Sequence, residues 1–351
     1  MKISAALALA CFAFAGSALA DPTITLFDAP GRPKADGTVA TAVNGAGDVT
    51  GYWITHTTRR IHGFIRMADG TFESFSIPPR TNETSPTAID DSDTTIGNYR
   101  HGRTDIGFVR TQAGTVASID FGKRVKNTGV SAEAIASDGT VTGWYLQNKR
   151  YHSFVRAPDG AITKFRAGPN SSSFDGTVAK AITPSGVIAG YYSSNDDVAH
   201  GFIRAADGKI KLFDAPGAGT RTGAGTFAAA MNASGAIAGA TRDDNLAWHG
   251  FVRHTDGSID MFDLNGAGAD QNQGTKIVAI NDAGAVTGYV VGSDFIGHGF
   301  VAASKDEVAY FDASGDMGAR GTYPQGLNAA GEIAGYTIDL DHRMHGFVRT
   351  P

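Results

Sequence analysis

Hydrophobic and polar positions alternate in short runs along the chain, and the runs recur with a period of about 47 residues. One recurring phrase reads small residue, apolar residue, Asn-like residue, two turn residues, Gly, any residue, Val or Ile, any residue, Gly and Tyr. It begins at Ala42, Ala88, Ala134, Ala181, Ala230, Ala279 and Gly326. The spacings are 46, 46, 47, 49, 49 and 47 residues. Self-similarity at a fixed period predicts a repeat architecture.

Two further phrases follow in each unit. The second reads His-Gly-Phe-Val-Arg in its full form, and Ile106 takes the place of its His in the second copy. Its other six copies carry His62, His152, His200, His249, His298 and His345. The third phrase comes after an Asp-Gly turn and ends in Phe-Asp-x-Pro, as in residues 213–216. Both phrases contain the short apolar runs that are typical of strands.

Each unit therefore reads as four short strands. The Asn-x-x-Gly and Asp-Gly segments predict tight turns, because Gly and Asn tolerate the positive φ angles that such turns require. No segment sustains an apolar period of 3.6 residues, so no helix is expected. Four strands in about 47 residues are typical of a β-propeller blade, and a linear β-solenoid is the alternative.

The two ends of the repeat region favour a closed ring. The last unit stops at Pro351 after its third strand, whereas residues 24–30 read as a fourth strand that belongs to no unit. Residues 326–351 and 21–41 contribute 26 and 21 residues, which together make one repeat of 47. Closing the ring removes exposed strand edges. We therefore predict an all-β fold with one domain over residues 21–351: a seven-bladed propeller with four strands per blade, closed by the N-terminal strand.

The first 20 residues predict a signal peptide. Lys2 precedes an apolar run that ends in Ala18-Leu19-Ala20 before Asp21, which is the A-x-A pattern of a cleavage site. This predicts a secreted protein, in the periplasm or the medium. Cys11 is the only cysteine and lies within this leader, so the mature chain has no thiol for disulfides, metal ligation or nucleophilic catalysis.

Composition and charge narrow the function classes further. Glycine makes up 46 of 351 residues, about 13% against an average near 7%, as suits a chain rich in turns. The formal net charge is −5 with Lys and Arg scattered, which argues against nucleic-acid binding. No apolar stretch of about 18 residues follows the leader, so no membrane span is expected. We expect a monomer without a cofactor, whose partner is a glycan or a cell-envelope protein.

The Ala-Ile-Asn-x-x-Gly, Gly-Tyr, His-Gly-Phe and Phe-Asp-x-Pro-Gly phrases together resemble the HAF-type family of probable extracellular repeats in bacterial secreted proteins. The resemblance covers essentially the whole mature chain. It implies secretion and a repeat architecture. It implies no activity and no catalytic residues, because that family is defined by its repeat.

Residues that recur in every unit are interpreted as structural. The phrase histidines are expected to connect loop backbone with a neighbouring strand. The Arg that ends the same phrase is expected to pair with the Asp of the fourth strand, such as Asp214 or Asp263. A Thr four residues before six of the seven repeat starts, for example Thr38, is expected to satisfy loop backbone through its hydroxyl group, and Val130 is the exception.

Residues that depart from the repeat are the better candidates for a site. By analogy with other propellers, we expect ligands at the mouth of the channel, on the face that carries the longer loops. Charges on the inner strands would orient a polar ligand there, and aromatic side chains suit stacking on sugars. The candidate ligand-binding residues are Glu133, Lys180, Lys276, Tyr323, Gln325, Arg100, His101 and Trp248.

One acidic cluster raises the question of Ca²⁺. Asp90, Asp91 and Asp93 occupy the place of an Asn-x-x-Gly turn, and carboxylate oxygens are ligands that Ca²⁺ prefers. The spacing of an EF-hand, with its Gly and distal Glu, is absent, so a degenerate turn is the favoured interpretation and no metal ligand is assigned. The phrase histidines would be too far apart to share one ion.

Three functional hypotheses remain. The first is a non-catalytic binding or surface-interaction module, favoured by the even repeats and by the absence of Gly-x-Ser-x-Gly, His-Glu-x-x-His and phosphate-loop motifs. The second is a secreted polysaccharide lyase or hydrolase, in which Glu133 with Lys180, or His101 with Arg100, would supply acid–base and charge-stabilising groups. The third is a purely structural role.

Overall fold

A computed structural model describes residues 22–30, 35–56, 58–77, 83–121, 127–168, 176–194, 196–313 and 320–351. The predicted leader, residues 1–20, lies outside the described residues. The described part of the chain consists of strands and the turns and loops between them, without a helix, which confirms the all-β prediction. It accordingly contains no helix that is long and apolar enough to cross a membrane.

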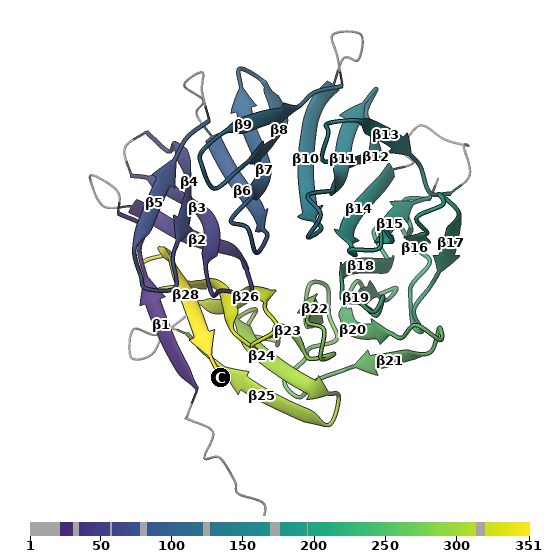
Figure 1. Cartoon of the computed structure of the whole chain (residues 1–351). Coiled ribbons are helices and arrows are strands. Elements are labelled where there is room, and N and C mark those ends of the chain that lie inside the picture. Colours follow the sequence, from purple (N-terminus) through teal and green to yellow (C-terminus); the bar gives the residue numbers. More distant parts are fainter. Residues whose placement is uncertain are drawn as a thin grey trace, which may run out of the picture.

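The strands form antiparallel groups of four, set around a common centre (Figure 1). The innermost strands are β2 (Ala35–Val43), β6 (Glu83–Ile89), β10 (Asn127–Ile135), β14 (Gly176–Ile182), β18 (Gly225–Met231), β22 (Gly274–Ile280) and β26 (Gly321–Leu327). The second strands are β3 (Val49–Thr55), β7 (Thr95–His101), β11 (Val141–Gln147), β15 (Ile188–Ser193), β19 (Ile237–Arg242), β23 (Val286–Val291) and β27 (Ile333–Ile338).

The outer half of each group is a second hairpin. The third strands are β4 (Ile61–Arg66), β8 (Thr104–Arg110), β12 (Arg150–Arg156), β16 (Ala199–Arg204), β20 (Trp248–Arg253), β24 (Gly297–Ser304) and β28 (Met344–Thr350). The outermost strands are β5 (Phe72–Phe75), β9 (Val116–Ile119), β13 (Ile162–Phe165), β17 (Ile210–Phe213), β21 (Ile259–Phe262), β25 (Glu307–Phe311) and β1 (Thr23–Phe27).

The N-terminal strand β1 serves as the outermost strand of the last group. It pairs antiparallel with β28 over five residue pairs, from Thr23 with Thr350 to Phe27 with Gly346. The side chain of Phe27 also packs edge-on against Phe64 of the first group, with ring centroids 6.0 Å apart. This strand thus connects the two ends of the chain through backbone hydrogen bonds on one side and through apolar contact on the other.

The core is built from one aromatic contact that recurs between neighbouring groups. The Phe of each His-Gly-Phe phrase is 0% exposed, and an outermost-strand Phe of the preceding group packs against it in several copies, as Phe213 does against Phe251 at 6.1 Å. The fully buried phrase residues are Phe64, Phe108, Phe154, Phe202, Phe251, Phe300 and Phe347. Alternation of apolar and polar residues along each third strand directs this ring toward the preceding group.

The recurring Thr has the role that the sequence predicts. The buried hydroxyl group of Thr226 accepts the backbone N–H of Ala215 at 2.9 Å, and Thr275 does the same for Leu264 at 3.0 Å. Each bond fixes the loop that enters an innermost strand. A buried amide without such a partner would be costly, which explains why a hydroxyl-bearing residue recurs here.

The Asn of the turn phrase joins neighbouring groups as well as shaping its own turn. Its side-chain amide donates to the backbone carbonyl of the next turn: from Asn232 to Asn281, from Asn281 to Asn328, and from Asn328 to Asn44. The last of these bonds spans 284 residues of sequence and joins the last group to the first. Asn44 continues the series by donating to Asp90.

The predicted pairing of the phrase Arg with the fourth-strand Asp is wrong. Asp214 instead accepts from the Nδ1 of His200 at 2.9 Å, and the guanidinium group of Arg204 lies over the ring of Phe165 in the preceding group, 5.0 Å from its centroid. Arg204 pairs across the hairpin with Ile210, whereas Asp214 follows Phe213, the partner of Gly201, so Arg and Asp stand at opposite ends. Corresponding His–Asp pairs are formed by His249 with Asp263, His298 with Asp312 and His345 with Asp28.

Candidate functional site

A bulge in each innermost strand aims one side chain at the centre. The pairing register between the innermost and second strands shifts by one residue, immediately before the repeat start. The extra residue at a bulge is left out of the ladder, so its side chain is free to point elsewhere. These bulged residues are Thr41, Thr87, Glu133, Lys180, Ala229, Val278 and Gln325.

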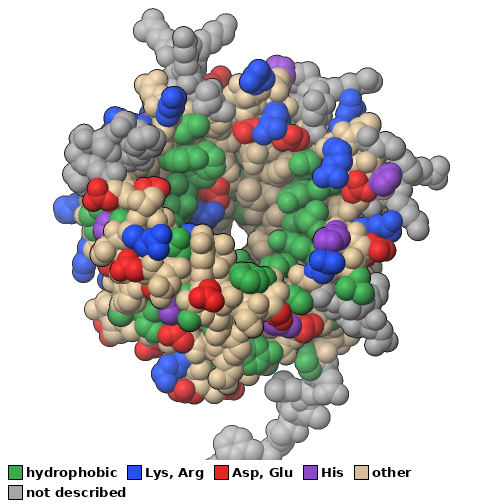
Figure 2. Space-filling model, turned by 180° about the vertical axis from the view of Figure 1, so that it is seen from behind, with side chains coloured by type: hydrophobic (Ala, Val, Ile, Leu, Met, Phe, Trp, Pro, Cys, Tyr) green, Lys and Arg blue, Asp and Glu red, His purple; other side chains and the backbone are tan. Residues whose placement is uncertain are grey.

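All seven bulged residues line one central pocket of about 560 Å³. Its wall is completed by residues of the groups from β14 to β25: Tyr191, Phe227, Ala228, Ala240, Trp248, Lys276 and Ile277. A central hollow, with hydrophobic side chains around much of it, is visible in Figure 2. The pocket brings together five of the eight sequence candidates, namely Glu133, Lys180, Lys276, Trp248 and Gln325.

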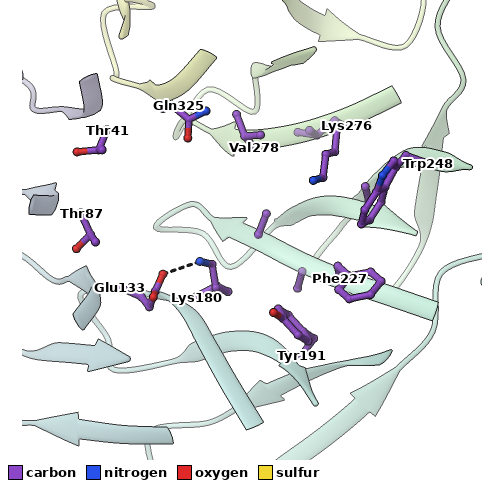
Figure 3. A pocket seen from close by; sticks show the side chains of 14 residues that line it. Thr41, Thr87, Glu133, Lys180, Tyr191, Phe227, Trp248, Lys276, Val278 and Gln325 are labelled. Atoms are coloured by element: carbon purple, nitrogen blue, oxygen red, sulfur yellow. Dashed lines mark hydrogen bonds and ion pairs between the residues drawn. The ribbon is translucent and has the colours of Figure 1, made fainter. Parts of the chain in front are cut away.

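Glu133 and Lys180 form an ion pair between two neighbouring groups (Figure 3). The Lys180 Nζ lies 2.5 Å from Glu133 Oε2, and the indole Nε1 of Trp144 donates to the other carboxylate oxygen at 2.8 Å. Burial lowers the pKa of Lys180, but the charge of Glu133 and the hydrogen bond to it more than offset this, so that the pKa is raised. The two charges neutralise each other and are fixed in place.

An aromatic series forms one wall of the pocket (Figure 3). The rings of Tyr191 and Phe227 meet edge to face at 5.1 Å, and Phe227 and Trp248 do so at 5.4 Å. Sequence reasoning missed Tyr191 and Phe227. Tyr191 belongs to the recurring Gly-Tyr phrase, but Phe227 occupies the same position as Lys276 and Tyr323, three residues before a repeat start, and that shared position is the signal that could have identified it.

Lys276 is the cation of this wall. Its Nζ lies 4.3 Å from the centroid of the Trp248 ring, and Arg242 lies over the same ring at 4.7 Å. Among the described residues, no carboxylate forms an ion pair with Lys276. Burial lowers the pKa of Lys276, and the positive charges of Arg242 and Lys180 lower it further. A negative charge nearby would therefore stabilise the charged form of the Lys276 side chain.

The opposite side of the pocket is polar and uncharged. Thr41 and Thr87 donate their hydroxyl groups to backbone carbonyls of the next group, those of Pro86 and Ala132. The two hydroxyl groups therefore connect neighbouring groups, and their oxygen atoms can still accept hydrogen bonds. The side chain of Gln325 points toward the same space in Figure 3 and offers both an amide donor and a carbonyl acceptor.

Tyr323 lies outside the pocket lining, within a cluster of tyrosines. Its ring packs edge to face against Tyr289 at 5.1 Å and stacks on Tyr336 at 5.2 Å. Burial raises the pKa of Tyr336 to about 12, with a smaller contribution from the neighbouring tyrosines. Burial also raises the pKa of Tyr289 strongly. The three tyrosines of this cluster are not among the residues that line the pocket.

The tyrosine cluster predicts a loss of stability in alkali. A group whose pKa is higher in the folded than in the unfolded state stabilises the fold below its unfolded pKa, near 10 for Tyr, and loses that contribution as the pH rises through the folded pKa. We expect Tyr336→Phe to reduce the fall in unfolding free energy between about pH 10 and about pH 12, measured by denaturant titration. The exposed Tyr310 gives the control variant Tyr310→Phe. An equally steep fall in Tyr336→Phe would contradict this assignment.

Arg100 and His101 lie away from the pocket. Arg100 forms ion pairs with Glu83 at 2.8 Å and Asp105 at 2.9 Å, and the Asp105 hydrogen bond is the main reason that its pKa is raised. His101 is exposed at the end of β7. Because the seven bulged positions face the centre, candidates at the outer ends of second strands do not converge with them.

The acidic cluster of the second group serves turns. Asp91 accepts the backbone N–H of Gly45 at 2.7 Å, and Asp93 accepts from the side-chain amide of Asn44 at 3.0 Å. Asp90 accepts two backbone N–H groups within its own turn. Within the described ranges, no group of three or more His, Cys, Asp or Glu side chains is arranged to hold a metal ion.

Comparisons with known proteins give the fold class. No family model and no curated protein sequence matches the chain. Among solved structures, virginiamycin B lyase from Staphylococcus aureus is similar with a TM-score of 0.59 and 12% identity, over 94% of this chain and 100% of that one. A streptogramin B lyase has a TM-score of 0.57 and 12% identity, over 93% and 97%. At this identity the likeness shows the fold alone, and it defines an all-β protein of propeller-like architecture.

Proposed function

We propose that this protein is an exported seven-bladed β-propeller of the HAF-type repeat family, that β1 closes its ring, and that it binds a glycan at the central pocket without catalysis. The ring closure is supported by the pairing of β1 with β28 and by the Phe27–Phe64 contact. The bond from Asn328 to Asn44 supports it independently on the turn side. Export rests on the leader sequence alone, and the periplasm and the medium are both compatible with it.

The observation that carries the binding proposal is the composition of the pocket. Aromatic faces, the amide of Gln325 and charged groups converge on one space of about 560 Å³, which lies within the range of roughly 300–1,000 Å³ for small-molecule sites. Sugars offer the complementary surfaces, because their C–H faces pack on aromatic rings and their hydroxyl groups exchange hydrogen bonds with amides. The Phe227–Trp248 wall and Gln325 supply these two kinds of contact.

The state of Glu133 favours binding over catalysis. It is the sole carboxylate among the described residues that line the pocket, and both of its oxygens are occupied, by Lys180 and by Trp144. A general acid or base needs access to the reacting proton, and the two bonds to Glu133 obstruct that access. Lys180 is held charged by the same pair, which opposes the alternative of a lyase or hydrolase that uses these two groups.

A glycan array and a calorimetric titration of residues 21–351 test the proposal, with released product assayed in parallel. We expect saturable binding without product. Gln325→Ala should weaken binding several-fold, since a hydrogen bond to a ligand contributes about 0.5–1.5 kcal/mol. Gln112→Ala is the matched control, because Gln112 is exposed on the turn side and bonds to Asp93.

Three results would contradict the proposal. Released product would favour the enzyme hypothesis instead. Absence of binding to every glycan on the array would favour an envelope protein as the partner. If Gln325→Ala and Gln112→Ala changed the affinity for the ligand equally, the ligand would not be bound in the central pocket.

A further inference from the structure

We infer that the central pocket selects a carboxylate-bearing saccharide, such as a hexuronate or sialic-type sugar, and that Lys276 binds the carboxylate. The inference rests on the proposed function and specifies its ligand class. The pocket already has a paired charge in Glu133 and Lys180, whereas Lys276, among the described residues, has only aromatic faces as partners, those of Trp248 and Tyr289. A ligand carboxylate would form an ion pair with Lys276.

The charge balance of the pocket supports an anion. Its described lining contains one carboxylate and two ammonium groups, so it is net positive in a chain whose formal charge is −5. Arg242 adds a third cation behind Trp248, and its hydrogen bonds go to uncharged acceptors such as the backbone carbonyl of Gly223. An uncompensated cation that is partly withdrawn from water gains more from a nearby anion than an exposed one does.

The remaining lining favours a sugar over a small inorganic anion. Phosphate or sulfate would use Lys276 and leave the apolar wall of Phe227 and the amide of Gln325 without contacts. A uronate ring carries its carboxylate on one edge and hydroxyl groups on the others, with a C–H face between. Figure 3 shows a partner for each of these surfaces: Lys276 lies between the amide of Gln325 and the aromatic wall of Trp248 and Phe227.

The test uses calorimetric titration of residues 21–351 with digalacturonate, a glucuronate-containing disaccharide and sialyllactose, each beside its methyl ester. The ester keeps the sugar rings and removes the charge. We expect the acid forms to bind about tenfold more tightly or better, because hydrogen bonds to charged groups contribute about 1.5–3 kcal/mol. Lys276→Gln should remove this preference, so that each acid and its methyl ester bind with similar affinities.

Lys305→Gln is the matched control, since Lys305 is exposed and pairs with Asp306 outside the pocket. Salt dependence gives a second readout that needs no variant: raising the ionic strength should weaken the acid forms and spare the esters. Equal affinities for acid and ester, with Lys276→Gln silent, would overturn the inference and leave glycan binding standing. Tighter binding of phosphate than of any acid sugar would overturn the ligand class. Failure of acids, esters and all array glycans would overturn the proposed function itself.

Discussion

Deleting residues 21–30, and with them β1, is expected to lower the free energy of unfolding by more than about 4 kcal/mol. Truncating one core Phe alone costs about 3–5 kcal/mol. The deletion removes the partly buried Phe27 together with five backbone pairs to β28. It also removes the contact between Asp28 and His345 and the bond from Ala29 to Thr38. Scanning calorimetry of the deleted and full mature chains measures the difference.

The deletion should also change the association state. The exposed edge of β28 would present unpaired N–H and C=O groups, which pair readily with another chain, so we expect concentration-dependent self-association in sedimentation. Thr25→Ala is the control, because Thr25 is exposed on β1 and its loss leaves the ladder intact. An unchanged melting temperature in the deleted chain would refute closure of the ring by β1.

Gly288→Ala is expected to destabilise the protein at or above the upper end of the range of about 1–3 kcal/mol for overpacked cores. A Cβ at this position would lie 1.9 Å from the backbone carbonyl oxygen of Lys276 and 2.9 Å from the Cα of Ile277. Backbone atoms of a paired strand do not yield as a flexible side chain does, so β22 and β23 would have to separate. Because Lys276 lies on β22, ligand binding should weaken with stability.

Gly129→Ala provides the matched control for Gly288→Ala. The Cβ added to Gly129 would meet nothing closer than 3.7 Å, and the residue is also in a strand. Denaturant titration of both variants should show a small change for Gly129→Ala and a large one for Gly288→Ala. Similar changes in the two variants would mean that the Gly of the Gly-Tyr phrase recurs for a reason other than close strand approach.

The strands were predictable because their signals are local. Turn residues mark the ends of each hairpin, and the hydroxyl of a Thr such as Thr226 has its partner in the adjoining loop of the same group. The partner of Arg204 was not predictable in this way. Its choice between Asp214 and Phe165 depends on which end of the hairpin each residue occupies and on which side the preceding group lies.

The site was predictable only in part, for a related reason. Glu133, Lys180 and Lys276 were identified because their charges break the repeat. Phe227 does not break it in polarity, and its role arises only because neighbouring groups bring Tyr191 and Trp248 against it. Which side chains meet across a junction between groups cannot be derived from the sequence of one repeat.

The asparagines of the Asn-x-x-Gly turns have a consequence for where the fold opens locally. Their bonds join turns from Asn232 through Asn281, Asn328 and Asn44 to Asp90. The next turns have Ala136 and Thr183 at this position, which lack the amide, so the three junctions from Asp90 to Asn232 have no such bond. Slow local opening of the fold should therefore occur first at these three junctions. At one of them, the Glu133–Lys180 ion pair joins the two neighbouring groups. The charges of this pair would then stabilise the junction between two groups as well as line the pocket, and their neutralisation would destabilise this part of the molecule first.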